Sequence, residues 1–171
     1  MHWLMTNSQT GETERPLQEW KYSYVAGIVD FNSSLTVSIQ EMSDRKVGYG
    51  IIPKLRVTNP HRGSIEFLRE FCEEHDISPR VGPRNNTFRL EVTKRNELRK
   101  FTSLIQPYLI ARYESVEILR TRLLPGLEHG VGSTKKGFIR LVRYADRIRE
   151  RTSSAGSKYD ESYFKDEWDI Q

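Results

Sequence analysis

The chain has 171 residues, of which 29% are charged and 36% hydrophobic, and its net charge at pH 7 is +4. This length is enough for one domain with a full hydrophobic core. No run of about 18 apolar residues is present, which excludes a membrane-spanning helix, and residues 1–20 lack the basic start and apolar core of a secretory signal. Cys72 is the only cysteine, so no internal disulfide or cysteine-based metal cluster can form.

The positive charge is concentrated between the two ends of the chain. Residues 21–159 include 25 basic and 15 acidic residues, whereas residues 1–20 and 160–171 are both acidic. A basic body with acidic ends favours a polyanionic partner, although a merely solvated charged surface would have the same composition.

Residues 1–15 lack periodicity and are expected to be a flexible leader. A helix is predicted for residues 16–30, because Pro16 suits a first helical turn and apolar residues recur at helical spacing. That stripe consists of Leu17, Trp20, Tyr24, Gly27 or Ile28, and Phe31. Ala26 and Gly27 are adjacent small residues, and a helical glycine costs about 1 kcal/mol relative to alanine. Close approach of another helix is one reason to carry that cost.

Two hairpins are predicted next, separated by a short helix. Alternation of apolar and polar residues indicates strands at 35–41, 49–58, 79–84 and 87–93, with a turn at Asn85-Asn86. The helix between the hairpins runs to about residue 75, with Ser64 as its expected N-cap. One face of the four strands is polar, and its members are Thr36, Ser38, Gln40, Lys54, Arg56, Thr58, Arg80, Arg84 and Arg89.

The second half of the chain is predicted to be helical. Helices are expected at 95–105, at 107–124 with Pro125-Gly126 as the stop, and at 135–151. The last of these is strongly basic and carries an apolar stripe of Phe138, Leu141, Val142, Ala145 and Ile148. A flexible link at 153–157 leads to a final helix or tail at 158–168.

Residues 25–33 read Val-Ala-Gly-Ile-Val-Asp-Phe-Asn-Ser and resemble the motif that names the LAGLIDADG homing endonucleases. The order helix, hairpin, helix, hairpin, helix matches the αββαββα core of that family. Residues 54–59, Phe67-Leu68, 92–94 and 101–109 agree with it in position and type.

The resemblance implies an α+β fold with a saddle-shaped antiparallel sheet and additional C-terminal helices. The implied organisation is a leader at 1–15, a DNA-binding and nuclease core at 16–127, and a basic helix with a tail at 134–171. With one motif per chain, it implies a homodimer on a near-palindromic double-stranded DNA site, with Ala26, Gly27 and Asp30 at the helix crossing. It also implies an intracellular protein, in a prokaryotic cytoplasm or an organelle, with no membrane partner.

In this family, the eighth motif residue is an acid that binds Mg²⁺ with help from the preceding carbonyl. Here that position is Asn32, preceded by Phe31, and the ninth position is Ser33 where the family has glycine. By position, Lys94 matches the basic residue near the scissile phosphate. Asn59 (or Pro60, if the alignment is shifted by one) matches the polar residue that orders water. Hydrolysis with a divalent metal needs hard oxygen ligands, usually carboxylates.

DNA contact is expected from the polar strand positions, since Arg, Lys and Gln can contact phosphates or base edges. Basic residues of the C-terminal region are expected to contact phosphates beside the saddle. These are Lys135, Lys136, Arg140, Arg143, Arg147 and Lys158.

Asn32 leaves three interpretations open: a designed change that traps uncut DNA, a natural loss in a chain retained for binding, or an active variant that uses another acid. The sequence therefore predicts a metal-dependent, site-specific DNA endonuclease impaired by Asn32. The alternative is a non-cutting DNA- or RNA-binding protein of the same fold, such as an intron maturase or a repressor. A third option is an unrelated basic enzyme.

Overall fold

The computed structural model describes residues 14–152 and 157–170, so most of the expected leader and most of the expected link at 153–157 lie outside the described residues. The elements in chain order are α1 (Glu14–Asn32), β1 (Ser33–Glu41), β2 (Tyr49–Asn59), α2 (Arg62–Glu74), β3 (Arg80–Arg84), β4 (Thr87–Val92), α3 (Arg95–Ile105), η1 (Gln106–Tyr108), α4 (Tyr113–Ile118), η2 (Leu119–Leu123), α5 (Leu124–Glu128), η3 (Val131–Ser133), α6 (Lys135–Arg151) and α7 (Glu161–Trp168). None of the described helices is long and apolar enough to cross a membrane.

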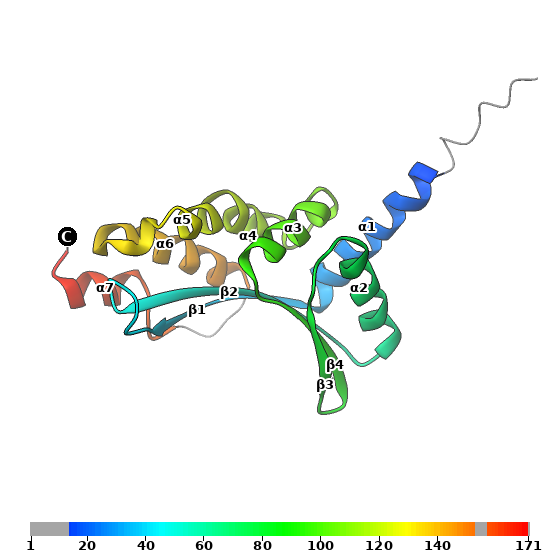
Figure 1. The fold of residues 1–171 in the computed structure, drawn as a ribbon, viewed down its shortest axis with the longest axis horizontal. Helices are drawn as coiled ribbons and strands as arrows, with labels where there is room; N and C mark the ends of the chain where they lie inside the picture. Colours follow the sequence, from blue (N-terminus) through cyan, green and yellow to red (C-terminus); the bar gives the residue numbers. More distant parts are fainter. Residues whose placement is uncertain (1–13, 153–156, 171) are drawn as a thin grey trace, which may run out of the picture.

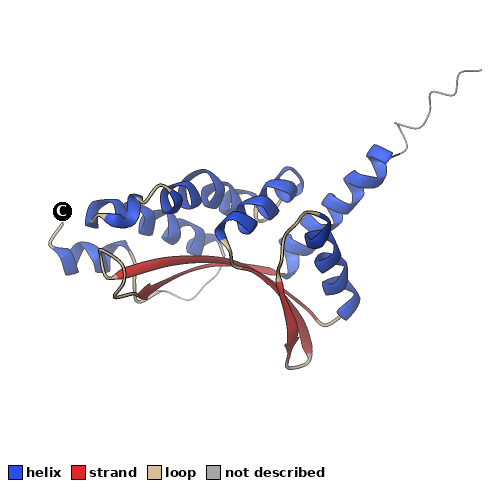
Figure 2. Cartoon of the chain, viewed as in Figure 1, coloured by secondary structure: helices blue, strands red, loops and turns tan. Residues whose placement is uncertain are grey.

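The four strands form one antiparallel sheet in the order β1-β2-β4-β3. The sheet is arched, with the helices packed over its convex side and its concave side left uncovered (Figures 1 and 2). This arrangement confirms the predicted α+β class and the αββαββα order.

Strand register assigns the two faces of the sheet. Ser34 lies opposite Arg56 and Thr36 opposite Lys54, while Thr58 lies opposite Arg89. Directly opposed residues point to the same face, so the predicted polar positions share one face. The alternate positions are buried against the helices: Leu35, Val37, Ile39, Ile51, Leu55, Val57, Leu90 and Val92. We call the first set the polar sheet face; it comprises Thr36, Ser38, Gln40, Lys54, Arg56, Thr58, Arg80, Arg84, Arg89 and Glu91.

Helix α6 begins and ends where the sequence predicts. Thr134 caps it, because the Thr134 hydroxyl oxygen accepts a hydrogen bond from the Gly137 N–H at 3.1 Å. Its apolar stripe is almost completely buried, with Phe138 only 2% exposed. The stripe therefore supplies much of the core between the helices and the convex side of the sheet.

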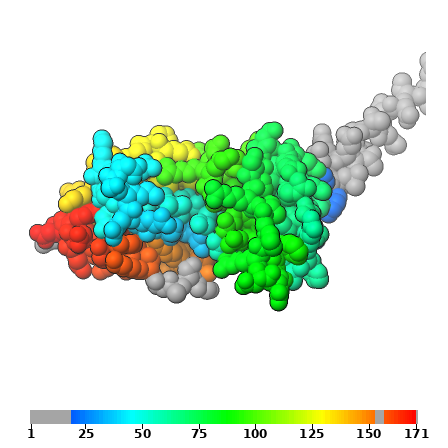
Figure 3. All heavy atoms as spheres, turned by 60° about the horizontal axis from the view of Figure 1, so that its bottom comes forward, coloured from blue at the N-terminus to red at the C-terminus, as the bar shows by residue number. Residues whose placement is uncertain are grey.

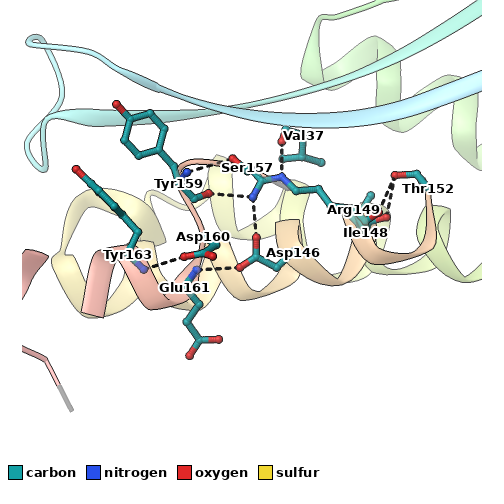
Figure 4. Close-up of polar contacts among 10 residues, drawn as sticks. All are labelled: Val37, Asp146, Ile148, Arg149, Thr152, Ser157, Tyr159, Asp160, Glu161 and Tyr163. Atoms are coloured by element: carbon teal, nitrogen blue, oxygen red, sulfur yellow. Dashed lines mark hydrogen bonds and ion pairs between the residues drawn. The ribbon is translucent and has the colours of Figure 1, made fainter. Parts of the chain in front are cut away.

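Arg149 of α6 holds the outer edge of β1 (Figure 4). Val37 lies opposite Pro53, which has no N–H, so the Val37 carbonyl must point away from β2. Arg149 Nε donates to that carbonyl at 2.9 Å, and its Nη1 donates to Asp146 at 2.6 Å and to the Tyr159 carbonyl at 3.0 Å. One guanidinium thus ties the edge strand to α6 and to the segment that leads into α7.

Burial raises the pKa of the Asp146 carboxyl, although hydrogen bonds from the Glu161 N–H and from Arg149 oppose that rise. The Glu161 carboxylate pairs with Arg143 of α6 and Lys165 of α7, and these two side chains lower the pKa of Glu161 to about 2. The expected final helix is α7. Its first residue, Glu161, joins it to α6 through an ion pair with Arg143 and a hydrogen bond from the Glu161 N–H to Asp146.

Three details of the predicted elements are wrong. Ser64 lies inside α2 rather than capping it; His61 precedes the helix, and its N–H donates to Asn59 Oδ1 at 2.8 Å. The helix predicted to begin at Pro107 begins at Tyr113. Residues 109–112 are irregular, because the Asp30 carboxylate accepts hydrogen bonds from the backbone N–H groups of Ile110 and Arg112. Pro125 does not end the helix, since the π-helical turn η2 precedes it and wider hydrogen bonding there accommodates a residue without an N–H.

Candidate catalytic centre and nucleic-acid interface

Helix α1 runs into β1 without a loop, and this junction carries the motif's polar end. Asn32 is the last residue of α1 and is exposed, whereas Ser33 opens β1 and is 7% exposed. The last carbonyls of a helix have no partner within it and carry partial negative charge. The Phe31 carbonyl and the Asn32 amide therefore present neutral oxygen atoms at a place that favours a cation.

Asp30 faces its own chain at this junction and is 8% exposed. Its two carboxylate oxygens accept hydrogen bonds from the Ile110 N–H at 2.8 Å and the Arg112 N–H at 2.9 Å. Ala26 is fully buried in the same core. Neither side chain reaches the open surface of α1 in the single chain, and their expected place at a crossing with another helix stays a prediction.

Arg112 is the basic side chain that the fold brings to the motif end. Its Nη2 donates to the Ser33 carbonyl at 2.9 Å. Arg112 Nε and Ser33 Oγ are buried and have no partner among the residues that the structure describes. No sequence pattern indicated Arg112, because its segment was expected to be helical and only the Asp30 contacts place it here.

Asn59 ends β2 close to this junction, since Val57 lies opposite Ser33. Asn59 Oδ1 accepts from the His61 N–H, and its Nδ2 has no hydrogen bond among the described residues. Lys94 lies elsewhere: it follows β4, whose last residue Val92 is opposite Leu55, and its ammonium pairs with Glu97 at 2.8 Å. Within the described part of the chain, no hydrogen bond or ion pair connects Lys94 to Asn59 or to Asn32.

The open side of α1 is apolar. Trp20 and Tyr24 are each 48% exposed and Phe31 is 87% exposed. A Cβ added at Gly27, between them along the helix, would meet nothing within 4 Å. These four residues recur at helical spacing, so they form one stripe, which we call the open α1 stripe. Trp20 and Tyr24 also contact Phe67 of α2, at ring-centroid distances of 5.8 and 5.2 Å.

The polar sheet face is basic and lies on the uncovered concave side. Figure 3 looks toward this side, where the atoms of β1 and β2 (cyan) and of β3 and β4 (green) form the surface. Its acid, Glu91, pairs with Arg56 at 2.6 Å and lies 3.6 Å from Arg89. Burial raises the pKa of Glu91, but the Arg56 hydrogen bond and the nearby positive charges outweigh it, so the pKa is below its usual range. Glu91 thus holds Arg56 and Arg89 in place on this face.

Three of the C-terminal lysines lie at the start of α6 and around the outer end of β1. Lys135 lies over the Trp168 ring, 5.5 Å from its centroid, and Lys136 is exposed on the same end of α6. Lys158 Nζ donates to the Tyr159 hydroxyl at 3.2 Å, and that hydroxyl in turn bonds to Glu41 at 2.5 Å. These lysines therefore belong to the outer end of β1 and to the helix layer.

The residues at the motif end do not by themselves fit a carboxylate-held Mg²⁺. No group of three His, Cys, Asp or Glu side chains suited to a metal occurs among residues 14–152 and 157–170. Asp30 already accepts two backbone hydrogen bonds, and Asn32 offers a neutral amide. A carboxylate at position 32 would supply the missing charge.

No protein-family model matches the sequence, and no curated protein matches it. Among solved structures, the archaeal intron-encoded homing endonuclease I-Vdi141I complexed with DNA superposes with a TM-score of 0.76 and 23% identity, covering 90% of this chain and 99% of that one. The homing endonuclease I-CvuI with the I-CreI target gives 0.76 and 14%, covering 88% and 93%. The LAGLIDADG homing endonuclease I-LtrWI bound to its target DNA gives 0.69 and 16%, covering 88% of this chain and 49% of that one. At these identities the likeness establishes the fold: the chain has the LAGLIDADG homing endonuclease fold.

Proposed function

We propose that two copies of this chain form a saddle that binds a near-palindromic double-stranded DNA site. In this proposal the architecture is that of a metal-dependent endonuclease, and Asn32 impairs cleavage. The observation that carries the proposal is the strand register, which gathers Lys54, Arg56, Arg80, Arg84 and Arg89 on one uncovered, concave face. A β-ribbon of this kind fits the major groove, where Arg and Gln pair with guanine and adenine.

The homodimer is supported by the open α1 stripe. Two aromatic side chains that are about half exposed and one that is 87% exposed leave an apolar helix face that a second copy would cover. Gly27 in that face allows close approach of two helices. The chain also spans about half of the I-SmaMI and I-LtrWI chains, at 48% and 49%, so two copies would equal one such chain.

The chemistry assigned to the chain is limited by position 32. A divalent cation supplies charge stabilisation and an activated water to phosphodiester hydrolysis, and the DNA complexes of I-CvuI were obtained in the presence of Mg or Ca. Arg112 would hold the end of α1 through the Ser33 carbonyl, and the free Asn59 amide would position water. Without a carboxylate at position 32, this form is expected to bind DNA and not to cut it.

The test is selection of a binding site from a random duplex library, followed by cleavage assays with Asn32→Asp and Mg²⁺. We expect the unchanged chain to select a site with two-fold symmetry, and we expect Asn32→Asp to cut it across the centre. Asn32→Ala serves as the matched control that should bind without cutting. Failure of the chain to select any duplex would refute the proposal.

A second candidate function is a non-cutting binder of the same fold, and the neutral Asn32 specifically favours it. As a repressor, the chain would select a DNA site but gain no cleavage with Asn32→Asp. As an intron maturase, it would retain structured RNA in preference to duplex DNA in a competition assay.

A further inference from the structure

A cavity of about 260 Å³ lies at the outer end of the sheet, far from the motif end. It is formed where the turn between β1 and β2 meets the start of α3 and the segment around η3. Figure 3 shows the cyan atoms of the turn beside the yellow atoms of α5. Its walls include Arg45, Lys46, Arg95, Ser133 and the ring of Phe138. This volume is below the roughly 300–1,000 Å³ of pockets for drug-sized ligands, which points to a small ligand group.

The cavity wall is cationic. Arg95 is half-buried, and within the described residues it forms no ion pair; its hydrogen bond, to the Leu127 carbonyl, is long at 3.4 Å. Asp44 is the acid in the wall, but it is mostly exposed and lies 3.7 Å from Arg45. Glu128, nearby, is engaged by Arg99 at 2.7 Å. Burial lowers the pKa of Arg95 and the charge of Arg45 lowers it further, while the Glu128 carboxylate opposes both. Arg45 and Arg95 thus line the same cavity, and no buried acid lies in its described wall, so a bound anion would reduce the repulsion between them.

The neighbouring strand edge is open at this point. β4 pairs with β2 only from Leu55 onward, so the outer half of β2 has no strand on that side. Residues two apart on a strand direct their backbone nitrogens to the same side. The nitrogen of Pro53 points away from β1, so the N–H of Ile51 also points away from β1, toward the cavity that Ile51 lines. Ile51 and Arg95 both line the cavity, so its wall offers a backbone donor as well as a guanidinium.

We propose that this cavity binds a backbone phosphate of the bound DNA at the outer end of each half-site. The inference rests on the proposed function. β1 has nine residues, so the turn lies about 26 Å from the motif end at about 3.3 Å per residue. At about 3.4 Å per nucleotide step, that is roughly eight base pairs outward. A DNA strand bordering the groove on the polar sheet face would pass along the open edge of β2.

The experiment compares Arg95→Met with Arg122→Met, a control that removes the same charge from an exposed position outside the cavity. Both are titrated against the duplex selected by the unchanged chain, in a long form and in a form trimmed to about six base pairs on each side of its centre. Arg95→Lys keeps the charge, and thermal unfolding of every variant confirms that it is folded. A parallel titration uses inorganic phosphate alone, followed by NMR.

For Arg95→Met we expect about tenfold weaker binding per half-site on the long duplex and a log–log salt slope lower by about 0.9 per protomer. Arg95→Lys should retain most of the affinity, and the trimmed duplex should show no difference. Equal losses for Arg95→Met and Arg122→Met, or equal losses on both duplexes, would overturn the proposal but leave the proposed function intact. Arg95-dependent binding of inorganic phosphate with unchanged DNA affinity would overturn it in favour of a free-anion site. If the unchanged chain selects no duplex, the proposed function fails first.

Discussion

Helices α1 and α6 carry the same kind of apolar stripe, but only the stripe of α6 is covered by its own chain. In α6, Phe138 and Leu141 are at most 2% exposed, whereas in α1 Tyr24 is 48% and Phe31 87% exposed. Apolar residues at helical spacing indicate that one face of a helix will be covered, since exposed apolar surface is unfavourable in water. It does not show whether the cover comes from the same chain or from another one.

The two helices resemble one another in a second respect. Each has a buried charged residue near its C-terminal end that holds a distant segment: Asp30 holds the backbone of residues 110–112, and Arg149 holds the Val37 carbonyl and the Tyr159 carbonyl. The first contact fixes the inner end of the sheet, beside the motif, and the second fixes its outer edge. Both helices are therefore rigidly placed, and the difference between them lies in their apolar faces.

The largest expected effect is on the covered stripe. Phe138→Ala should lower the free energy of unfolding by about 3–5 kcal/mol, because it removes a ring buried against Tyr49, Phe164 and Trp168. Chemical denaturation measures the change, which should be the same at all protein concentrations. Phe138→Leu is the matched control and should cost less than about 1.5 kcal/mol. A small, concentration-dependent loss for Phe138→Ala would contradict the assignment of this stripe to the monomer core.

The next largest effect concerns Asp30, which holds the inner end of the sheet. Asp30→Ala should lower the free energy of unfolding by about 2–4 kcal/mol, because it leaves the Ile110 and Arg112 N–H groups without their acceptor. Asp30→Asn keeps one carbonyl oxygen and should lose about half as much. Amide hydrogen exchange at residues 110 and 112 should accelerate in both variants. Unchanged exchange there would mean that Asp30 does not hold this segment in solution.

These anchors also show how far the sequence could be read. Period-2 alternation predicted the strands and the shared polar face, and α6 was predicted with its bounds and its apolar stripe, because local patterns determine them. The contacts of Asp30 and Arg112 could not be predicted, since they join positions about 80 residues apart through backbone groups. For the same reason Arg112 was missed, while Lys94, chosen by position, lies away from the motif end.

A substitution in the open α1 stripe should affect dimerisation rather than the stability of the monomer, the opposite of a substitution in the α6 stripe. Phe31→Ser should change the stability of the monomer by less than about 0.5 kcal/mol, because the ring contacts mostly water in the single chain. It should weaken dimerisation by about 2–3 kcal/mol, since the ring would be buried in the dimer. Analytical ultracentrifugation over a concentration series measures this loss. Ile110→Ser, also at an exposed apolar position (89%), tests whether the covered area extends beyond α1. A dimer unaffected by Phe31→Ser would place the interface elsewhere.

The smallest effect separates the two roles of α1 by sign. Gly27→Ala should stabilise the monomer by up to about 1 kcal/mol, because alanine is the better helix former and its Cβ meets no atom of the chain within 4 Å. The same methyl group should weaken dimerisation, since it would stand between two closely crossing helices. Gly63→Ala in α2 is the matched control: its Cβ also meets nothing within 4 Å, and it should leave dimerisation unchanged. If Gly27→Ala strengthens both folding and dimerisation, then the helices do not cross closely at Gly27, and the open α1 stripe must be covered by a looser contact.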